Sequence, residues 1–466
     1  MKSTSLKSIA PRNLFAARLL VAMTLLVSSL TSGAQVGLKT YTGTFDDGAT
    51  YLMEVPRDWN KTLFLYSHGL NFLGNPNPPA DSGDLLVRLY LLSHGYALAG
   101  SSYATTGVAI EDALRDQILV LDKFKELVGQ PARTIAWGHS MGGQTTAGLL
   151  QYHPERFSGA VSLCGGLAGS VGLNNEWLDA AFAFNVLLAS GSLEVAHITD
   201  PFGNLDKFEQ LLGDAQSTPQ GQARIALAAA LMDSSGWIDP FTPEPDPTDY
   251  ATRELNQAIA MDESSGNFFP LRADWEARAG GSPSWNTGVD YRKQLQRSIN
   301  YAEVQALYQQ AGLNLDTDLD ALNSAPRIAA DPAAVNYAIQ NVSFNGELKV
   351  PFLTVHTTGD EIVNVQVEQA YAAVVHKKHN GAFLRQTFVH RAGHCAYTAA
   401  EMIAAIQALI HRLDTGKWHG IDANSLNVAG AALPPVYNTL FIGSGPFEPA
   451  YVNYTSAKFL RRFDAP

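Results

Sequence analysis

The feature that most constrains the fold of this chain is a regular alternation of short apolar segments with longer amphipathic ones. The short segments have the composition of buried β-strands, and the longer ones have helical periodicity and end at glycine, as at Gly95 and Gly129. Strands that alternate with helices form βαβ units and a parallel sheet with both faces covered. The expected strands lie at 61–69, 96–102, 133–138, 157–166, 350–360 and 383–390.

The alternation is interrupted by a long segment that is mainly helical in pattern, and it then resumes. Residues 35–168 and 346–466 are therefore predicted to form one doubly wound domain, with 169–345 inserted into it as a helical cap. Ligands of open parallel sheets bind at the carboxyl ends of the strands, so an insertion at such an end lies above the site and can act as a lid. We expect its mobile part to be the Pro-rich loop 237–247, WIDPFTPEPDP. The tail, 417–466, has no strong period and is not placed.

The amino terminus has the pattern of a secretory signal peptide. Four cations precede an apolar segment at 19–30, and the small residues Ser32 and Ala34 follow. The alternative is a membrane anchor, but a spanning helix needs about 20 apolar residues. We therefore expect residues 1–34 to be removed after Ala34 and the mature chain, which has no segment that could span a bilayer, to be secreted or periplasmic.

Charge and composition exclude some classes of partner. The chain is 46% hydrophobic and 16% charged, as expected of a globular protein, and its formal net charge is −12. It has no basic tract, which argues against nucleic-acid binding because phosphate contacts need clustered Lys and Arg. The expected partner is a small molecule, and the sequence does not indicate the oligomeric state.

A serine lies between small residues where a predicted strand meets a predicted helix, in Gly138-His139-Ser140-Met141-Gly142. One interpretation is a helix cap, and the other is a nucleophile elbow, G-x-S-x-G. Serine needs a base within hydrogen-bond reach and an acid that orients the base. Asp360 and His394 follow two later strands, in the chain order Ser, Asp, His. The ends of three strands thus predict a catalytic triad.

With this motif and chain order, the sequence resembles the serine α/β-hydrolases, a superfamily of esterases, lipases and some peptidases. The resemblance covers most of the chain outside the insertion and implies an α/β-hydrolase fold, in which a mostly parallel, doubly wound sheet carries the inserted cap. It also implies that the backbone N–H of Met141 forms one half of an oxyanion hole. The other half should come from the loop after the strand at 61–69, where Leu70 is the candidate. No cofactor and no metal are implied.

Some assignments around this site have neighbours as alternatives. Glu361 adjoins Asp360, and His390 precedes His394, but His390 ends its strand instead of lying in the loop beyond it. Four further side chains are candidates for contacts with substrate, although ordinary core packing is the alternative for the aromatic ones. These four are His68, Tyr103, Trp177 and Phe182.

The two cysteines, Cys164 and Cys395, are each expected beside the site, since one ends a strand and the other follows His394. In an exported protein they are permitted to form a disulfide, and two buried thiols are the alternative. Secreted esterases similar to tannases and feruloyl esterases also place a cysteine after the histidine, bonded to one beside the serine. Here no cysteine adjoins Ser140, so that pattern is met only in half.

Together these features predict an exported serine hydrolase that cleaves a carboxylic ester through an acyl-enzyme on Ser140. A secreted serine peptidase of the aminopeptidase type and an acyltransferase are the alternatives within the same fold. A non-catalytic binding protein is a further alternative, and the complete triad argues against it. The sequence names neither the natural substrate nor the host.

Overall fold

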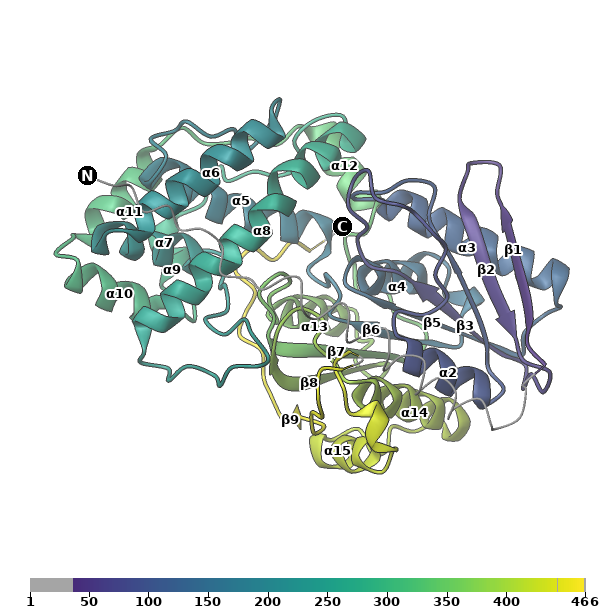
Figure 1. The fold of residues 1–466 in the computed structure, drawn as a ribbon. Helices are drawn as coiled ribbons and strands as arrows, with labels where there is room; N and C mark the ends of the chain where they lie inside the picture. The colour runs from purple at the N-terminus through teal and green to yellow at the C-terminus, as the bar shows by residue number, and fades with distance from the viewer. Residues whose placement is uncertain (1–36, 442, 465–466) are drawn as a thin grey trace.

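The computed structural model describes residues 37–441 and 443–464, and the predicted signal peptide lies outside this range. One sheet, in the order β1-β2-β4-β3-β5-β6-β7-β8-β9, forms the centre of the larger lobe in Figure 1. The six neighbouring strands β4, β3, β5, β6, β7 and β8 pair in parallel, whereas β1, β2 and β9 pair antiparallel at the two edges of the sheet. The strands are β1 (Lys39–Thr44), β2 (Thr50–Val55), β3 (Thr62–Ser67), β4 (Ala97–Ser101), β5 (Arg133–His139), β6 (Gly159–Leu163), β7 (Phe352–Gly359), β8 (Leu384–Ala392) and β9 (Tyr451–Val452).

Helices cover both faces of the sheet because its central strands are apolar on both faces. In β3, Leu63 and Leu65 belong to one buried cluster, while Phe64 and Tyr66 belong to the other. The alternation follows from the two-residue period of a strand. The helices on the first face are α3 (Ile110–Leu127), α4 (Met141–Tyr152) and α13 (Val367–Lys377), and those on the second are α2 (Leu85–Ser93), α14 (Ala399–Thr415) and α15 (Ala423–Ala431).

The segment between β6 and β7 forms a separate helical lobe, which Figure 1 shows beside the sheet. Its helices pack around an apolar cluster of their own, which includes Phe182, Phe184 and Tyr291. The bounds are α5 (Gly169–Leu187), α6 (Pro201–Gln216), α7 (Pro219–Ala230), α8 (Tyr250–Ala279), α9 (Tyr291–Leu295), α10 (Tyr301–Gln310), α11 (Leu315–Ser324) and α12 (Pro332–Gln340). We call this lobe, residues 169–345, the cap.

The tail that the sequence left unplaced links the sheet to the cap. After α15 the chain forms a short 3₁₀ helix, Pro435–Tyr437, and the short strand β9. It then returns to the boundary between the sheet and the cap, where Phe459 packs into the cluster on the first face of the sheet. Arg461 then forms an ion pair with the buried Asp179 of α5. Within the described residues, no helix is long and apolar enough to cross a membrane.

Candidate active site

Ser140 occupies a sharp turn between β5 and α4. Its backbone has φ 56° and ψ −123°, a conformation that residues other than glycine rarely adopt. The turn is possible because its flanking residues have no side chain. A Cβ on Gly138 or Gly142 would overlap the backbone oxygen of Ser67 at the end of β3. This close approach of three backbone segments holds the serine hydroxyl beyond the end of the sheet.

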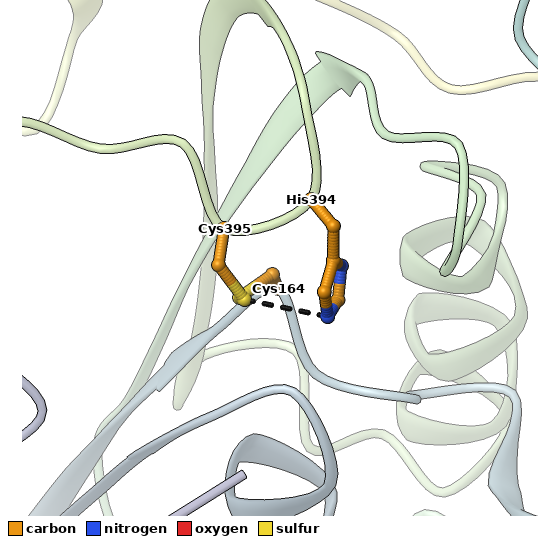
Figure 2. A group of neighbouring side chains, drawn as sticks. All are labelled: Cys164, His394 and Cys395. Atoms are coloured by element: carbon orange, nitrogen blue, oxygen red, sulfur yellow. Dashed lines mark hydrogen bonds between the residues drawn. A yellow bond between two sulfur atoms is a disulfide. The ribbon is translucent and has the colours of Figure 1, made fainter. Parts of the chain in front are cut away.

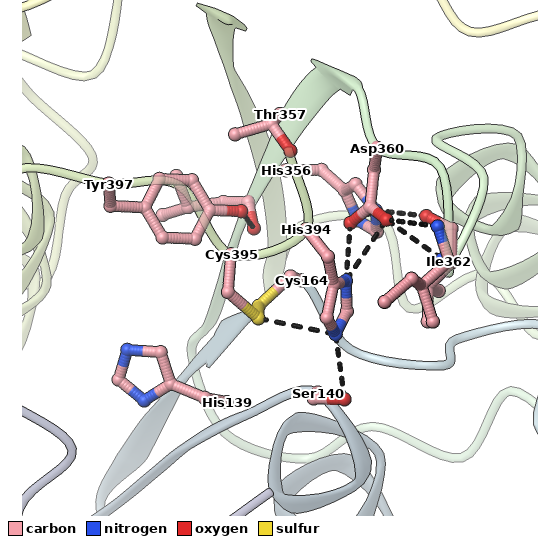
Figure 3. Close-up of a disulfide and its surroundings, with 12 residues drawn as sticks. His139, Ser140, Cys164, His356, Thr357, Asp360, Ile362, His394, Cys395 and Tyr397 are labelled. Carbon is pink, nitrogen blue, oxygen red and sulfur yellow. Dashed lines mark hydrogen bonds and ion pairs between the residues drawn. A yellow bond between two sulfur atoms is a disulfide. The ribbon is translucent and has the colours of Figure 1, made fainter. Parts of the chain in front are cut away.

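Ser140, His394 and Asp360 form one continuous chain of hydrogen bonds (Figure 3). Ser140 Oγ lies 2.8 Å from His394 Nε2, and His394 Nδ1 lies 2.8 Å from Asp360 Oδ2 and 3.0 Å from Oδ1. The three residues follow β5, β8 and β7, so the parallel sheet brings them together at one edge. In this arrangement a histidine can take the serine proton while a carboxylate orients the ring.

The Asp360 carboxylate is buried and fully hydrogen-bonded. Besides His394 it accepts the backbone N–H groups of Ile362 and Val363, at 3.0 and 2.8 Å. Burial by itself would raise the pKa of Asp360, but His394 and His356 beside it hold this pKa below its ordinary value. The acid of the arrangement is therefore ionised at neutral pH.

His356 is a member of this cluster that the sequence analysis missed. It is fully buried on β7, and its Nε2 lies 3.3 Å from Asp360 Oδ2, the oxygen that His394 also contacts (Figure 3). The signal was present as a lone histidine inside the apolar strand that leads to Asp360. A strand histidine that close to the acid could have been singled out, but its contact with Asp360 depends on the turn that follows β7.

Glu361 is the alternative acid, but its carboxylate contacts the backbone of His394 and not the imidazole ring. One oxygen accepts the backbone N–H of His394 at 3.3 Å, and the other has no partner among the described residues. Burial, and then the neighbouring charge of Asp360, raise the pKa of Glu361 to about 7. His390, the alternative base, lies on the outside of the sheet, 3.3 Å from Glu244.

The two candidate oxyanion residues border the same cavity as Ser140 and His394. Gly69 lies against the elbow, since a Cβ built on it would come within 3.4 Å of the Ser140 Cβ, and this brings Leu70 to the site. Among the described residues, the N–H groups of Met141 and Leu70 have no backbone or side-chain acceptor. Both groups are thus available to an oxygen bound above Ser140.

The cavity above Ser140 has a volume of about 410 Å³ and lies between the sheet and the cap. Most of its wall is apolar. Trp177 and Phe184 of α5 contribute to it, as do Phe269 and Trp275 of α8. Arg272 is the cation of the described wall, and its guanidinium is already bonded to Glu276 and two serines. The cavity is suited to a bulky apolar group next to the nucleophile.

Of the four side chains predicted to contact substrate, Trp177 borders the cavity and the other three do not. Phe182 points into the core of the cap, where its ring stacks on Tyr291 at 5.6 Å. His68 and Tyr103 are stacked on each other at 3.9 Å, and the Tyr103 hydroxyl donates to the His68 carbonyl. His68 and Tyr103 thus pack against each other beside the loop after β3, and substrate contact by these three side chains stays a prediction.

A disulfide joins Cys164 and Cys395, with their Cα atoms 5.3 Å apart (Figures 2 and 3). Cys395 Sγ lies 3.5 Å from His394 Nε2, so the bridge ties the histidine loop to the end of β6. Within the described chain, the residues with the spacing of metal ligands are Cys164, His394 and Cys395. Both sulfurs are taken up by the disulfide, which leaves a lone imidazole.

The chain is similar to several known proteins. The model of the α/β-hydrolase fold family matches residues 93–189. An o-phthalyl amidase from Xanthobacter agilis is 30% identical over 422 residues, which cover 84% of this chain and 90% of the relative. Among solved structures, feruloyl esterase B from Aspergillus oryzae is 15% identical with a TM-score of 0.42, over 82% of this chain and 80% of that one. An esterase from Pyrococcus furiosus is 10% identical with a TM-score of 0.40, over 82% and 92%.

Proposed function

This chain belongs to the α/β-hydrolase family, and on that premise we propose that it is an exported serine hydrolase that cleaves a carboxylic ester or amide. The observation that carries the proposal is the chain of hydrogen bonds from Ser140 through His394 to Asp360. That chain has the contacts that nucleophilic catalysis by serine requires, within ordinary hydrogen-bond distances.

In the proposed mechanism, His394 Nε2 takes the proton of Ser140 as Oγ attacks the substrate carbonyl. The N–H groups of Met141 and Leu70 donate to the oxyanion, and Asp360 stabilises the His394 imidazolium. His394 then gives its proton to the leaving oxygen or nitrogen, which departs and leaves an acyl-enzyme on Ser140. A water molecule that is deprotonated by His394 releases the acid and regenerates the serine.

The substrate is proposed to carry a bulky, apolar acyl group. The cavity beside Ser140 is lined by Trp177, Phe184 and other aromatic side chains, which suit an aryl or branched acyl group. An ester is the first candidate because its leaving alcohol departs more readily than an amine. An amide is the second, and the observation in its favour is the 30% identity to an o-phthalyl amidase over 90% of that relative.

Export is proposed from the amino-terminal pattern, and the Cys164–Cys395 disulfide supports it. Structural disulfides persist in oxidising compartments and are rare in the cytosol. The measurement is the amino-terminal sequence of the protein isolated from its host: mature chains that begin at Gln35 support the proposal, and chains that retain residues 1–34 contradict it.

The catalytic proposal is tested with Ser140→Ala and a fluorophosphonate probe, which labels activated serines. We expect the wild type to be labelled and Ser140→Ala to lose labelling, together with about 10⁴-fold or more of its turnover. The exposed serine variant Ser217→Ala is the matched control and should behave like the wild type. Turnover is measured on a chain-length series of nitrophenyl esters and on the matching nitroanilides. Equal labelling of wild type and Ser140→Ala would refute the assignment of the nucleophile.

A further inference from the structure

The carboxylate of Asp360 is shared by two histidines, which both lie near its Oδ2 (Figure 3). His394 faces the cavity, whereas His356 is fully buried behind the carboxylate and has no route to substrate. Behind His356 lies a second buried carboxylate, Glu368 of α13, whose Oε1 is 3.3 Å from His356 Nδ1. Two imidazoles and two carboxylates thus alternate from the cavity to the layer between β7 and α13.

The hydrogen bonds of His356 favour a proton on both of its ring nitrogens. Nε2 lies 2.8 Å from the carbonyl oxygen of Val363, which can only accept. Nδ1 faces Glu368, whose other oxygen already accepts from the Thr354 hydroxyl and from the Gln386 amide. With Glu368 ionised, both nitrogens face acceptors, and this arrangement favours an imidazolium. Burial would lower the pKa of His356, but Asp360 and Glu368 outweigh it and raise this pKa to about 10.

We propose that His356 is a positioning residue that stays protonated throughout the reaction and supplies the buried positive charge that sets the basicity of His394. This inference rests on the proposed function, since it concerns the same triad. It assigns a role to a side chain that touches neither the substrate nor Ser140.

The charges of the cluster give the direction of the effect. With His394 neutral, Asp360, Glu368 and the His356 imidazolium sum to −1, and they sum to zero once His394 has taken the serine proton. Without the charge of His356 the buried cluster would be at −2, and its field would favour protonated His394 before any substrate reacts. A base that is already protonated cannot accept the serine proton, so the reaction would need a higher pH.

The other titratable groups that face the cluster do not supply this charge. Tyr371 of α13 and Tyr397 after β8 are buried, and burial raises the pKa of each tyrosine above its ordinary value, so both stay neutral. Glu361 lies on the cavity side and adds only negative charge. Among the described residues around the acid, His356 is therefore the buried cation.

Substitutions at His356 and at Glu368, two buried residues in contact, test the proposal. The proposal predicts that they shift the pH dependence of Ser140 reactivity in opposite directions. His356→Gln removes the positive charge, and Glu368→Gln removes a negative charge on its far side. The rate at which a fluorophosphonate labels Ser140 is measured from pH 4 to 9. We expect the acid limb of that profile to move up by about one pH unit in His356→Gln and to move down in Glu368→Gln. The exposed His411→Gln should leave it in place.

A merely structural role would move neither limb, or would move both in the same direction as the site loosens. An acid limb that is unchanged or lowered in His356→Gln therefore overturns the proposal, and so does a raised limb in Glu368→Gln. If the wild type is not labelled at any pH, it is the proposed function that fails.

A measurement on the wild type keeps the proposal falsifiable if the variants do not fold. Nitrogen NMR of protein labelled with ¹⁵N-histidine distinguishes a doubly protonated ring from a neutral one. At pH 8.5 we expect one imidazolium to remain, whereas exposed histidines are neutral there. The finding that every histidine is neutral at pH 8.5 would overturn the proposal without reference to catalysis.

Discussion

At the scale of single residues, the adjacent carboxyls Asp360 and Glu361 differ in charge because their surroundings differ. Asp360 receives two backbone N–H groups and two histidines, and its pKa lies below the ordinary value. Glu361 receives one weak N–H contact, and its pKa is raised to about 7, chiefly by burial. Neighbouring carboxyls of one loop are thus separated into an ionised acid and one that titrates near neutrality.

The raised pKa of Glu361 predicts that the contribution of this carboxyl to the free energy of unfolding falls as pH rises from about 4.5 to 7. Over that range the unfolded chain has lost the proton that the folded chain still binds, so folding becomes less favourable. Glu361→Gln has no such charge. It should match the wild type at pH 4.5 and exceed it by roughly 3 kcal/mol at pH 8, because each pH unit between the folded and unfolded pKa values contributes about 1.4 kcal/mol.

Denaturant unfolding of both proteins at pH 4.5 and pH 8 measures this difference. The exposed Glu155→Gln serves as the control and should show the same dependence on pH as the wild type. A Glu361→Gln variant that is no more stable than the wild type at pH 8 would mean that the carboxyl ionises without cost in the folded protein.

At the scale of elements, α5 presents one aromatic side chain to the cavity and another to the core of the cap. Trp177 borders the cavity, and Phe182, five positions later, is 4% exposed and stacks on Tyr291. The helical period of 3.6 residues places positions five apart on different faces. Two aromatic residues of the same helix therefore have different surroundings.

This difference predicts two separable phenotypes. Trp177→Ala should change the preference between short and long acyl chains by roughly tenfold, with little loss of stability, because it reshapes the cavity. Phe182→Ala should lower the free energy of unfolding by about 3–5 kcal/mol and keep the wild-type chain-length profile, because it leaves a hole in the cap. Nitrophenyl ester kinetics and denaturant unfolding measure the two effects. A changed profile in Phe182→Ala with unchanged stability would reverse the assignment.

The Pro-rich loop between α7 and α8 is held against the sheet by contacts that the sequence did not reveal. Trp237 lies 5.2 Å from the His390 ring, and Phe241 lies 5.5 Å from Phe447 of the tail. The loop also passes close to Gly359 and Gly393, which adjoin the loops that carry Asp360 and His394. Residues 237–247 do not border the cavity, which is lined by Met232 just before them.

A substitution that loosens this loop is therefore expected to increase its access to proteases more than it changes the enzyme's preference among acyl groups. Phe241→Ala removes the ring contacts with Phe441 and Phe447, and an aromatic pair is worth about 0.5–1.5 kcal/mol. Limited proteolysis should then cleave within 237–247 roughly three to ten times faster, while the ester profile stays that of the wild type. A shifted ester profile would show that the loop shapes the substrate site after all.

At the scale of the whole molecule, the Cys164–Cys395 disulfide and the carboxyl-terminal tail both link segments that are far apart in the sequence. The disulfide links residues 231 positions apart, on either side of the cap, and Arg461 of the tail pairs with Asp179 of the cap. A cross-link over so long a loop lowers the entropy of the unfolded chain, by about 5 kcal/mol in the loop-closure model. The bridge also fixes the loop that carries His394.

Reduction of the disulfide should therefore lower activity before it unfolds the protein. The His394 loop loses its tether to β6 at once, whereas the sheet and its two apolar clusters remain packed. Ester turnover and circular dichroism are followed together as a phosphine reductant is added. The double variant Cys164→Ala/Cys395→Ala is the control and should not respond. Full activity of the reduced wild type would show that the tether does not position the histidine.

The sequence by itself determined the features that depend on local pattern. Segment periodicity indicated the parallel sheet and a helical insertion, and it placed Ser140, Asp360 and His394 at strand ends in that chain order. These follow because parallel strands end at one edge, so a residue's place in the chain gives its place in the fold. The motif likewise pointed to Gly138 and Gly142, whose missing side chains the elbow needs.

Only the tertiary structure decided which side chains meet. Helical period alone could not show that Trp177 faces the cavity while Phe182 faces Tyr291, because both are apolar and the cap has an apolar core of its own. The pairing of Cys164 with Cys395 depends on the distance between two strand ends, which spacing does not give. His356 belongs to no sequence motif. Its proposed role depends on two carboxylates that contact its ring, Asp360 from the turn after β7 and Glu368 from α13.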